Sequence, residues 1–343
     1  MGAGSRVGAE SSLWSARLIK YRPMPAPLQI PSHPLGAAGH RVPRVALGCG
    51  NFGGVGSAPA FFGQGLSLSE ALELMDAAWE LGIRHFDTAD AYGGGRSEEA
   101  IGAWIRSRRT RPTLTTKVFN PMTADGDHGL SPDRVRRQFA ASLERLGVDR
   151  VDLYLAHEYD PAVPLTDTIS AFDALRNDEK LTSYGVSNFD ATQVQRALAV
   201  GVPAAVQNGY SLLERRDDAD VIPLCARSGI GYIVFSPLCG GWLTGKYRRG
   251  AAYPFGSRMT QRPEPYEALA TDETFDRLEW LERLSIDRGT SMAGTSLAWL
   301  LADDRIAQVV VGPGRPEHLE PIREAIERPL TPDERRQITE TFT

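Results

Sequence analysis

Short apolar runs, each bounded by turn-forming residues, alternate along the chain with longer segments in which apolar residues recur every three to four positions. The runs have the length of buried strands, and the longer segments have the periodicity of amphipathic helices. The runs lie at residues 44–48, 83–87, 113–117, 151–156, 182–187, 203–207, 231–235 and 307–312. The clearest helical segments are residues 69–81, 131–146 and 291–302. The pattern predicts eight consecutive strand–helix units.

Eight such units indicate an α/β fold in which a parallel sheet closes into a (β/α)8 TIM barrel of about 250 residues. Residues 1–32 contain scattered Gly, Ser and Pro and are expected to form a flexible N-terminal tail. A short hairpin follows from residue 33, and a long loop at roughly residues 239–271 follows the seventh strand. Residues 33–343 are expected to form a single domain.

The charge balance and the cysteines exclude several classes of partner and site. The chain has 38 Lys and Arg against 43 Asp and Glu, so nothing favours nucleic acid or an anionic membrane as a partner. Cys49, Cys225 and Cys239 lack CxxC spacing, so neither a disulfide framework nor a zinc site is expected. No apolar run approaches the ~20 residues of a membrane-spanning helix, and no secretory signal is evident. These features favour a soluble protein of the reducing cytoplasm.

Nearly every predicted strand ends in a polar residue. These residues are Asp87, Lys117, His157, Ser187, Asn188, Gln207 and Ser236. Each alone has a plain structural explanation, because an aspartate at a strand end often caps a helix and a lysine often lies at the barrel rim. In a (β/α)8 barrel, however, the active site is built from the C-terminal strand ends and the loops that follow them. The joint placement of these polar residues at the strand ends therefore favours a functional site.

The segment "HFDTADAYGGGRSEE" at residues 85–99 places Tyr92 on a loop five residues after Asp87. A phenol has a pKa of about 10, and a neighbouring ammonium such as that of Lys117 lowers this value. Asp87 would hold Lys117 charged and in place, and the three glycines at 93–95 would let the loop bend. Tyr92 could then protonate a carbonyl oxygen as a hydride arrives at carbon. This chemistry requires no metal.

Six spaced motifs connect the chain to a family. They are "FDTADAYGGGRSEEAIG", "TTK" at 115–117, "VDLYLAHEYD" at 151–160, "YGVSNF" at 184–189, "VQNGYSLLER" at 206–215 and "FSPLCGGWLTGKY" at 235–247. Over about residues 33–325 the chain resembles the aldo-keto reductases, closest in motif style to the bacterial reductases and the potassium-channel β-subunit branch. The resemblance implies an NADP-dependent carbonyl reductase with the tetrad Asp87, Tyr92, Lys117 and His157, in which His157 orients the carbonyl.

The same resemblance implies where NADP(H) would bind. Asn188 and Gln207, with Ser187 beside them, would hydrogen-bond the nicotinamide carboxamide, and Phe235 would stack on the nicotinamide ring. The remaining contacts would come from the segment that follows the seventh strand. There, Ser236 and Leu238 would line the pyrophosphate path, and Lys246 and Arg258 would close over it.

The adenosine end departs from the family pattern. In "VGPGRPEHLEPIREAI" at 311–326, the residues that fit are Gly312, Gly314 and Arg315. His318 stands where glutamine is usual, and Pro321 and Ile322 replace a Glu-Asn pair. Arg315 can still offer a charged, forked donor to a 2′-phosphate. NADPH is therefore expected to be preferred over NADH, although both should bind more weakly than with the full set of contacts.

The motif "GCGNFG" at 48–53 matches a dinucleotide fingerprint, which must open directly into a helix. Here a long Gly-, Ser- and Ala-rich loop follows, so we interpret the motif as the end of the first strand and part of the pocket. Phe61 and Phe62 in this loop, with Trp242, either shape the substrate mouth or anchor the loops, and the sequence does not choose between these roles.

Other functions fit the same residues. Relatives that oxidise sugars or alcohols run the same chemistry backwards, and relatives that serve as channel β subunits keep the tetrad in a cofactor-binding regulatory module. The absence of an obvious partner-docking segment favours an enzyme that acts on a small carbonyl or sugar-like molecule. Relatives that reduce carbon–carbon double bonds carry Glu where this chain has His157, which favours carbonyls. Neither the substrate nor the oligomeric state is indicated.

Overall fold

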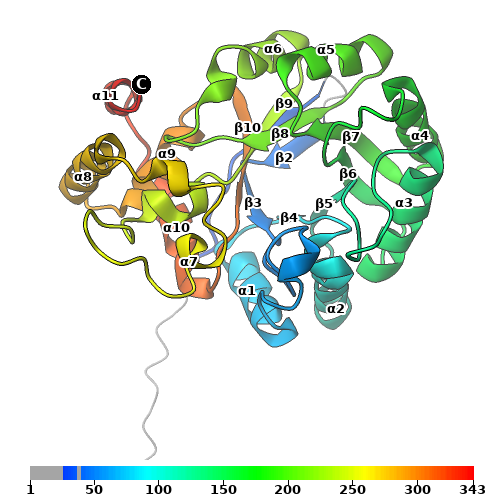
Figure 1. Ribbon diagram of the computed structural model, residues 1–343, viewed down its shortest axis with the longest axis horizontal. Coiled ribbons are helices and arrows are strands. Elements are labelled where there is room, and N and C mark those ends of the chain that lie inside the picture. Colours follow the sequence, from blue (N-terminus) through cyan, green and yellow to red (C-terminus); the bar gives the residue numbers. More distant parts are fainter. Residues whose placement is uncertain (1–25, 37–39) are drawn as a thin grey trace, which may run out of the picture.

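The structure is a computed structural model that describes residues 26–36 and 40–343. Eight parallel strands close into a barrel in sequence order, and the last pairs with the first (Figure 1). They are β3 Val45–Gly48, β4 His85–Asp87, β5 Thr113–Val118, β6 Val151–Ala156, β7 Leu181–Ser187, β8 Ala205–Gly209, β9 Gly231–Phe235 and β10 Ile306–Val311. All eight predicted strands and the (β/α)8 fold are confirmed. The parallel register, which pairs Gly48 with Asp87 and Asp87 with Thr115, brings the C-terminal strand ends to one rim.

Helices surround the barrel (Figure 1). They are α1 Leu68–Leu81, α2 Arg96–Arg108, α3 Pro132–Leu146, α4 Leu165–Asn177, α5 Ala191–Val200, α6 Val221–Ser228, α7 Arg258–Gln261, α8 Asp272–Asp287, α9 Met292–Leu301, α10 Glu320–Glu327 and α11 Pro332–Thr341. The three clearest predicted helices, now α1, α3 and α9, are confirmed within one residue at each end. Short 3-10 turns are η1 Pro59–Phe61, η2 Tyr92–Gly95, η3 Arg216–Asp218, η4 Cys239–Thr244, η5 Glu267–Leu269 and η6 Pro316–Leu319.

Local signals in the sequence set the helix ends. The Ser131 side chain accepts a hydrogen bond from the Arg134 backbone N–H at the start of α3, Pro132 occupies the first turn, and Gly147 ends the helix at φ 65°. Each feature satisfies a backbone requirement of a helix end without help from distant residues. The buried face of α3, which includes Val135 and Phe139, then packs against the barrel.

The predicted hairpin is confirmed as β1 Ser32–Leu35 and β2 His40–Pro43, which pair antiparallel. Leu35 and Val42 are buried in one cluster with barrel residues such as Ile233. The chain is packed before residue 33, because the Leu28 N–H donates to the Leu81 carbonyl oxygen at 2.8 Å and Ile30 packs against the core. The rest of the expected tail, residues 1–25, lies outside the described residues.

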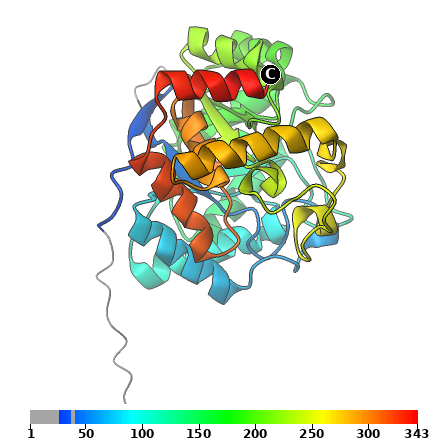
Figure 2. The same ribbon diagram turned by 90° about the vertical axis from the view of Figure 1, so that its left-hand side faces the viewer.

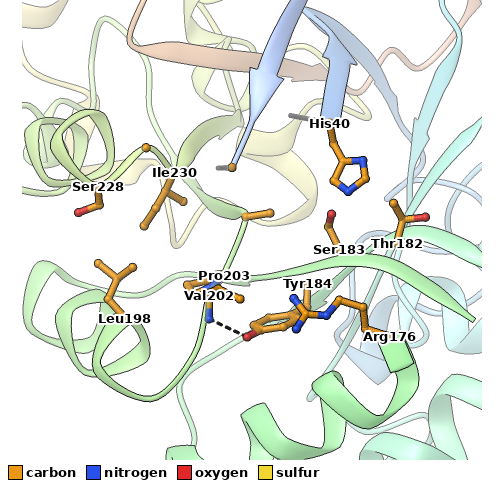
Figure 3. A pocket seen from close by; sticks show the side chains of 13 residues that line it. His40, Arg176, Thr182, Ser183, Tyr184, Leu198, Val202, Pro203, Ser228 and Ile230 are labelled. Carbon is orange, nitrogen blue, oxygen red and sulfur yellow. Dashed lines mark hydrogen bonds between the residues drawn. The ribbon is translucent and has the colours of Figure 1, made fainter. Parts of the chain in front are cut away.

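A pocket lies at the N-terminal end of the barrel, opposite the rim that carries the predicted site (Figure 3). Its lining includes His40 of the hairpin, Arg176 of α4 and Tyr184 of β7. The Tyr184 hydroxyl accepts a hydrogen bond from the Val202 N–H at 2.8 Å, and Arg176 pairs with Asp173 at 2.8 Å. The Tyr184 hydroxyl and the Arg176 guanidinium are thus engaged within the protein.

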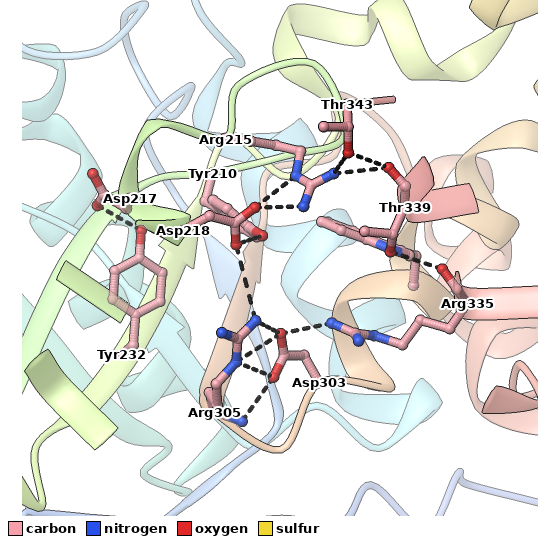
Figure 4. A network of polar contacts seen from close by, with 11 residues as sticks. Tyr210, Arg215, Asp217, Asp218, Tyr232, Asp303, Arg305, Arg335, Thr339 and Thr343 are labelled. Carbon is pink, nitrogen blue, oxygen red and sulfur yellow. Dashed lines mark hydrogen bonds and ion pairs between the residues drawn. The ribbon is translucent and has the colours of Figure 1, made fainter. Parts of the chain in front are cut away.

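A polar network attaches the C-terminal helix α11 to the barrel (Figure 4). Arg335 of α11 donates to Asp303 Oδ2 at 2.7 Å, and Arg305 donates to the same oxygen at 2.6 Å. Arg215, which follows β8, donates to the Thr339 carbonyl oxygen at 3.0 Å. Helices α8 and α11 lie on the same outer side of the barrel (Figure 2). Within residues 26–36 and 40–343, no helix is long and apolar enough to cross a membrane.

Candidate active site

Three of the predicted strand-end residues form a buried ionic centre. Lys117 of β5 donates from Nζ to Asp87 Oδ1 of β4 at 2.5 Å and to the Thr88 carbonyl oxygen at 2.8 Å. Gln207 of β8 donates from Nε2 to Asp87 Oδ2 at 2.8 Å, so both carboxylate oxygens are occupied. Burial alone would lower the pKa of Lys117, but the interactions with Asp87 and with Tyr92 together outweigh it and the pKa is raised. Lys117 is therefore held in its charged form.

Tyr92 lies beside this ion pair, with its ring centre 5.1 Å from Lys117 Nζ. Burial raises the pKa of Tyr92, and the ammonium of Lys117 opposes this effect only in part. We expected Lys117 to bring the pKa of Tyr92 below that of a free phenol. This expectation is wrong, because burial of the phenol outweighs the nearby positive charge and the net shift of the pKa is upward. The phenol is consequently neutral near pH 7, which is the form that donates a proton.

His157 completes the group, with its ring centre 5.6 Å from that of Tyr92 and an angle of 74° between the ring planes. The pKa of His157 lies well below its usual value because the imidazole is buried and because Lys117 is positively charged. The Asn120 amide and His157 Nδ1 lie 3.3 Å apart, within hydrogen-bond distance. A neutral imidazole in this position can donate one hydrogen bond to an oxygen atom near Tyr92.

The glycine-rich turn holds Tyr92 at the rim. Gly93 and Gly94 adopt positive φ angles of 60° and 69°, a backbone region that favours glycine. The Gly93 N–H donates to the Gly56 carbonyl oxygen at 3.3 Å, and a Cβ atom at Gly54 would lie 2.7 Å from Gly93 Cα. The loop after β3 therefore packs tightly against the turn that carries Tyr92.

The residues expected near the nicotinamide also lie at strand ends. Asn188 follows β7 at φ 60° and donates from Nδ2 to the His157 carbonyl oxygen at 2.9 Å and to Ser187 Oγ at 3.3 Å. The side-chain oxygens of Asn188 and Gln207 accept no hydrogen bond from any described residue. Phe235, at the end of β9, is half-buried, and its ring lies 3.4 Å from where a Cβ of Gly209 would be.

Basic residues expected near the phosphates come from two segments. Burial and the charges of Arg315 and Lys246 lower the pKa of His318, so these side chains lie near one another. Arg315 Nε lies 2.9 Å from His318 Nε2. Arg258 of α7 is half-buried, its pKa is lowered by burial, and no carboxylate of the described chain lies within 4.0 Å of its guanidinium.

The other residues expected along the cofactor path lie in the segments that follow β9 and β10. Ser236 and Leu238 are half-buried directly after β9, and Ser236 has a φ of 53°. Gly312 and Gly314 are exposed between β10 and η6, and the Gly314 N–H lies 3.3 Å from His318 Nδ1. Pro321 lies in the first turn of α10.

The structure decides one alternative that the sequence left open. Trp242 is buried and packs against Tyr247, Tyr253 and Phe275, so it anchors the loop after β9. Phe61 makes a different contact: the Arg262 guanidinium lies over its ring, with Cζ 5.7 Å from the ring centre.

Sequence reasoning missed Asn120, Arg262 and Asp90. Asn120 and Arg262 are brought to the rim by loop packing that no local pattern reveals. Asp90 shares its segment with Asp87, yet it is fully buried and neither carboxylate oxygen has a hydrogen-bond partner among the described residues. In the same part of the chain, no group of three or more His, Cys, Asp or Glu side chains could hold a metal ion.

Comparison with known proteins gives a consistent set of relatives. The model of the Aldo/keto reductase family matches residues 44–342. An L-glyceraldehyde 3-phosphate reductase of Escherichia coli is 31% identical over 304 residues, which cover 83% of this chain and 84% of the relative. A putative voltage-gated potassium channel subunit beta of Schizosaccharomyces pombe is 30% identical over 338 residues, covering 92% and 94%. An NADH-specific methylglyoxal reductase of Escherichia coli is 29% identical over 304 residues, covering 83% and 90%.

Proposed function

Because the chain belongs to the aldo/keto reductase family, we propose that it is an NADPH-dependent oxidoreductase that reduces the carbonyl group of a small aldehyde or ketone. The observation that carries the proposal is the contact between Lys117 and Asp87 beside the rings of Tyr92 and His157. Relatives named as reductases of glyceraldehyde 3-phosphate and of methylglyoxal support a small carbonyl substrate.

The residues at the rim fit a nicotinamide cofactor. Free side-chain oxygens on Asn188 and Gln207 can accept hydrogen bonds from a carboxamide, and the ring of Phe235 offers a stacking surface. Half-buried Arg258, with no carboxylate partner in the described residues, suits a phosphate. The cofactor, when bound, supplies the hydride.

Each residue of the tetrad has a separate task in the proposed reaction. Tyr92 donates its phenolic proton to the carbonyl oxygen, and its raised pKa keeps that proton available near pH 7. His157, neutral because of burial, donates a hydrogen bond that orients the carbonyl. Lys117 stabilises the phenolate that remains, and Asp87 holds Lys117 charged. Sugar or alcohol oxidation would use the same groups in reverse.

We assign the preference for NADPH to Arg315, with Lys246 and Arg258 as further phosphate contacts. Arg315 lies in the exposed segment between β10 and α10, with Glu317 at 3.8 Å and His318 at 2.9 Å. Pro321 and Ile322 offer no side-chain polar group for adenine, and Ile322 is buried. Both cofactors should therefore bind weakly, and the charge of Arg315 should decide between them.

The test is NADPH consumption with a panel of aldehydes, ketones, sugars and keto-sugars, followed by the Tyr92→Phe variant. This variant should bind NADPH as the wild type does and turn over at least ~10²–10⁴-fold more slowly, because the ring remains and the proton is lost. Tyr159→Phe is the matched control, since the only hydrogen bond of that hydroxyl within the described residues comes from the exposed Arg196 at 3.5 Å.

Two outcomes would contradict the proposal. If Tyr92→Phe keeps more than a tenth of the wild-type rate, with chemistry shown to be rate-limiting, Tyr92 is not the proton donor. If the wild type binds NADPH and turns over no member of the panel in either direction, the regulatory role of the channel-subunit relative becomes the better description.

A further inference from the structure

Two arginines in the loop after β9 have no anionic partner among the residues that the structure describes. Arg258 begins the short helix α7, and Arg262 follows it one turn later. Neither guanidinium lies within 4.0 Å of a carboxylate of the described chain. Arg262 also lowers the pKa of Arg258, as expected when two like charges lie close together. An external anion would relieve this repulsion.

Arg262 reaches across the mouth of the barrel to the loop after β3. Its guanidinium lies 5.7 Å from the ring centre of Phe61, and a Cβ atom at Gly56 would lie 3.9 Å from its Nη1. The Gly56 carbonyl oxygen accepts the N–H of Gly93, the residue that follows Tyr92. Arg262 therefore lies on the side of the mouth next to the Tyr92 turn, over a loop that none of the proposed cofactor contacts occupies.

The position of the Arg262 guanidinium over the Phe61 ring leaves its N–H groups available. A guanidinium that lies over an aromatic ring keeps its N–H groups directed outward in its own plane. Those N–H groups match the forked geometry of a phosphate or a carboxylate. No hydrogen bond from the Arg262 side chain to a described residue occupies them. Arg262 is thus a half-buried guanidinium without a hydrogen-bond acceptor among the described residues, over the loop that packs against the Tyr92 turn.

We propose that Arg262 binds the anionic group of a carbonyl substrate that carries a phosphate or a carboxylate, and so determines substrate specificity. This inference rests on the proposed reductase function. It separates the two arginines: Arg258 serves the cofactor, and Arg262 serves the substrate.

The experiment compares two pairs of aldehydes at saturating NADPH with the full chain. Glyceraldehyde 3-phosphate is compared with glyceraldehyde, which tests a phosphate. Succinic semialdehyde is compared with butanal, which tests a carboxylate. The variant is Arg262→Met, which keeps an apolar contact with Phe61 and removes the charge. The matched control is Arg283→Met, an exposed arginine of α8 with no ion-pair partner among the described residues.

The wild type should prefer the charged member of at least one pair. Arg262→Met should lower kcat/KM for that charged aldehyde by about 10- to 100-fold, the range of a hydrogen bond to a charged group. Its kcat/KM for the neutral partner should change less than twofold, and its NADPH affinity should not change. Arg283→Met should behave as the wild type does.

Three results would overturn the inference. A wild type that reduces the neutral aldehydes and shows no preference for the charged ones removes the anion site and leaves the proposed function intact. Weaker NADPH binding in Arg262→Met places this arginine at the cofactor instead. A wild type that turns over other members of the panel but none of these four aldehydes overturns the inference alone, whereas no turnover of any panel member in either direction overturns the reductase function on which it rests.

Discussion

Replacing the buried carboxyl of Asp90 should remove one contribution to the pH dependence of stability, the one that makes the folded protein less stable as the pH rises. Asp90 lies two residues before Tyr92, and its N–H donates to the Lys117 carbonyl oxygen at 3.1 Å. Burial, with a smaller contribution from the charge of Glu98, raises the pKa of Asp90 from 3.8 to about 8, although Arg134 opposes the shift. The native protein therefore keeps this proton near pH 7, whereas the unfolded chain has lost it.

The sign of the effect follows from proton counts. Between about pH 4 and pH 8 the native state binds one more proton at Asp90 than the unfolded state, so the contribution of Asp90 to stability falls as the pH rises. The slope approaches 1.36 kcal/mol per pH unit, which gives about 2.7 kcal/mol between pH 5 and pH 7. Asp90→Asn cannot ionise and loses this dependence. The unfolding free energy of the variant relative to the wild type should therefore rise by about 2.7 kcal/mol over that range.

The assay is urea unfolding, followed by tryptophan fluorescence at pH 5 and pH 7, for the wild type and Asp90→Asn. Any cost of burying the asparagine amide is the same at both pH values, so it cancels in the comparison. Asp125→Asn, at an exposed position without an ion-pair partner in the described ranges, is the control and should follow the wild type. Parallel pH dependences for wild type and Asp90→Asn would refute the reasoning, since Asp90 would then ionise alike in both states.

The two remaining predictions concern Lys117 and Arg315. Lys117→Met leaves the buried Asp87 unpaired and should lower the unfolding free energy by about 3–5 kcal/mol. The same change removes a charge that acts to lower the pKa of Tyr92, so this pKa should rise further and the pH profile of turnover should move. Wild-type stability of Lys117→Met would contradict the first expectation, and an unchanged pH profile would contradict the second. Arg315→Ala should abolish the preference for NADPH in fluorescence titrations with both cofactors, with Arg336→Ala as an exposed control. Equal affinities for NADH and NADPH in the wild type would remove Arg315 from the cofactor site.

Local patterns in the sequence were enough to predict the framework. Strands of a parallel barrel are buried on both faces and therefore read as apolar runs, which is why all eight could be located. Helix starts also depend on near neighbours, because the Ser131 and Ser291 side chains accept hydrogen bonds from backbone N–H groups three residues later. Once the barrel was inferred, its topology alone placed Asp87, Lys117 and Gln207 at one rim.

The sequence by itself thus determined the barrel, the rim and the types of residue gathered there, because periodicity, capping and strand order depend on near neighbours in the chain. Only the tertiary structure decided how those groups behave. Asp87 and Asp90 stand in one short segment, yet Lys117 and Gln207 pair with Asp87, whereas no described residue pairs with the carboxylate of Asp90. The pKa direction of Tyr92 was equally hidden. Desolvation and charge–charge interaction depend on residues distant in sequence, and only packing brings those residues together.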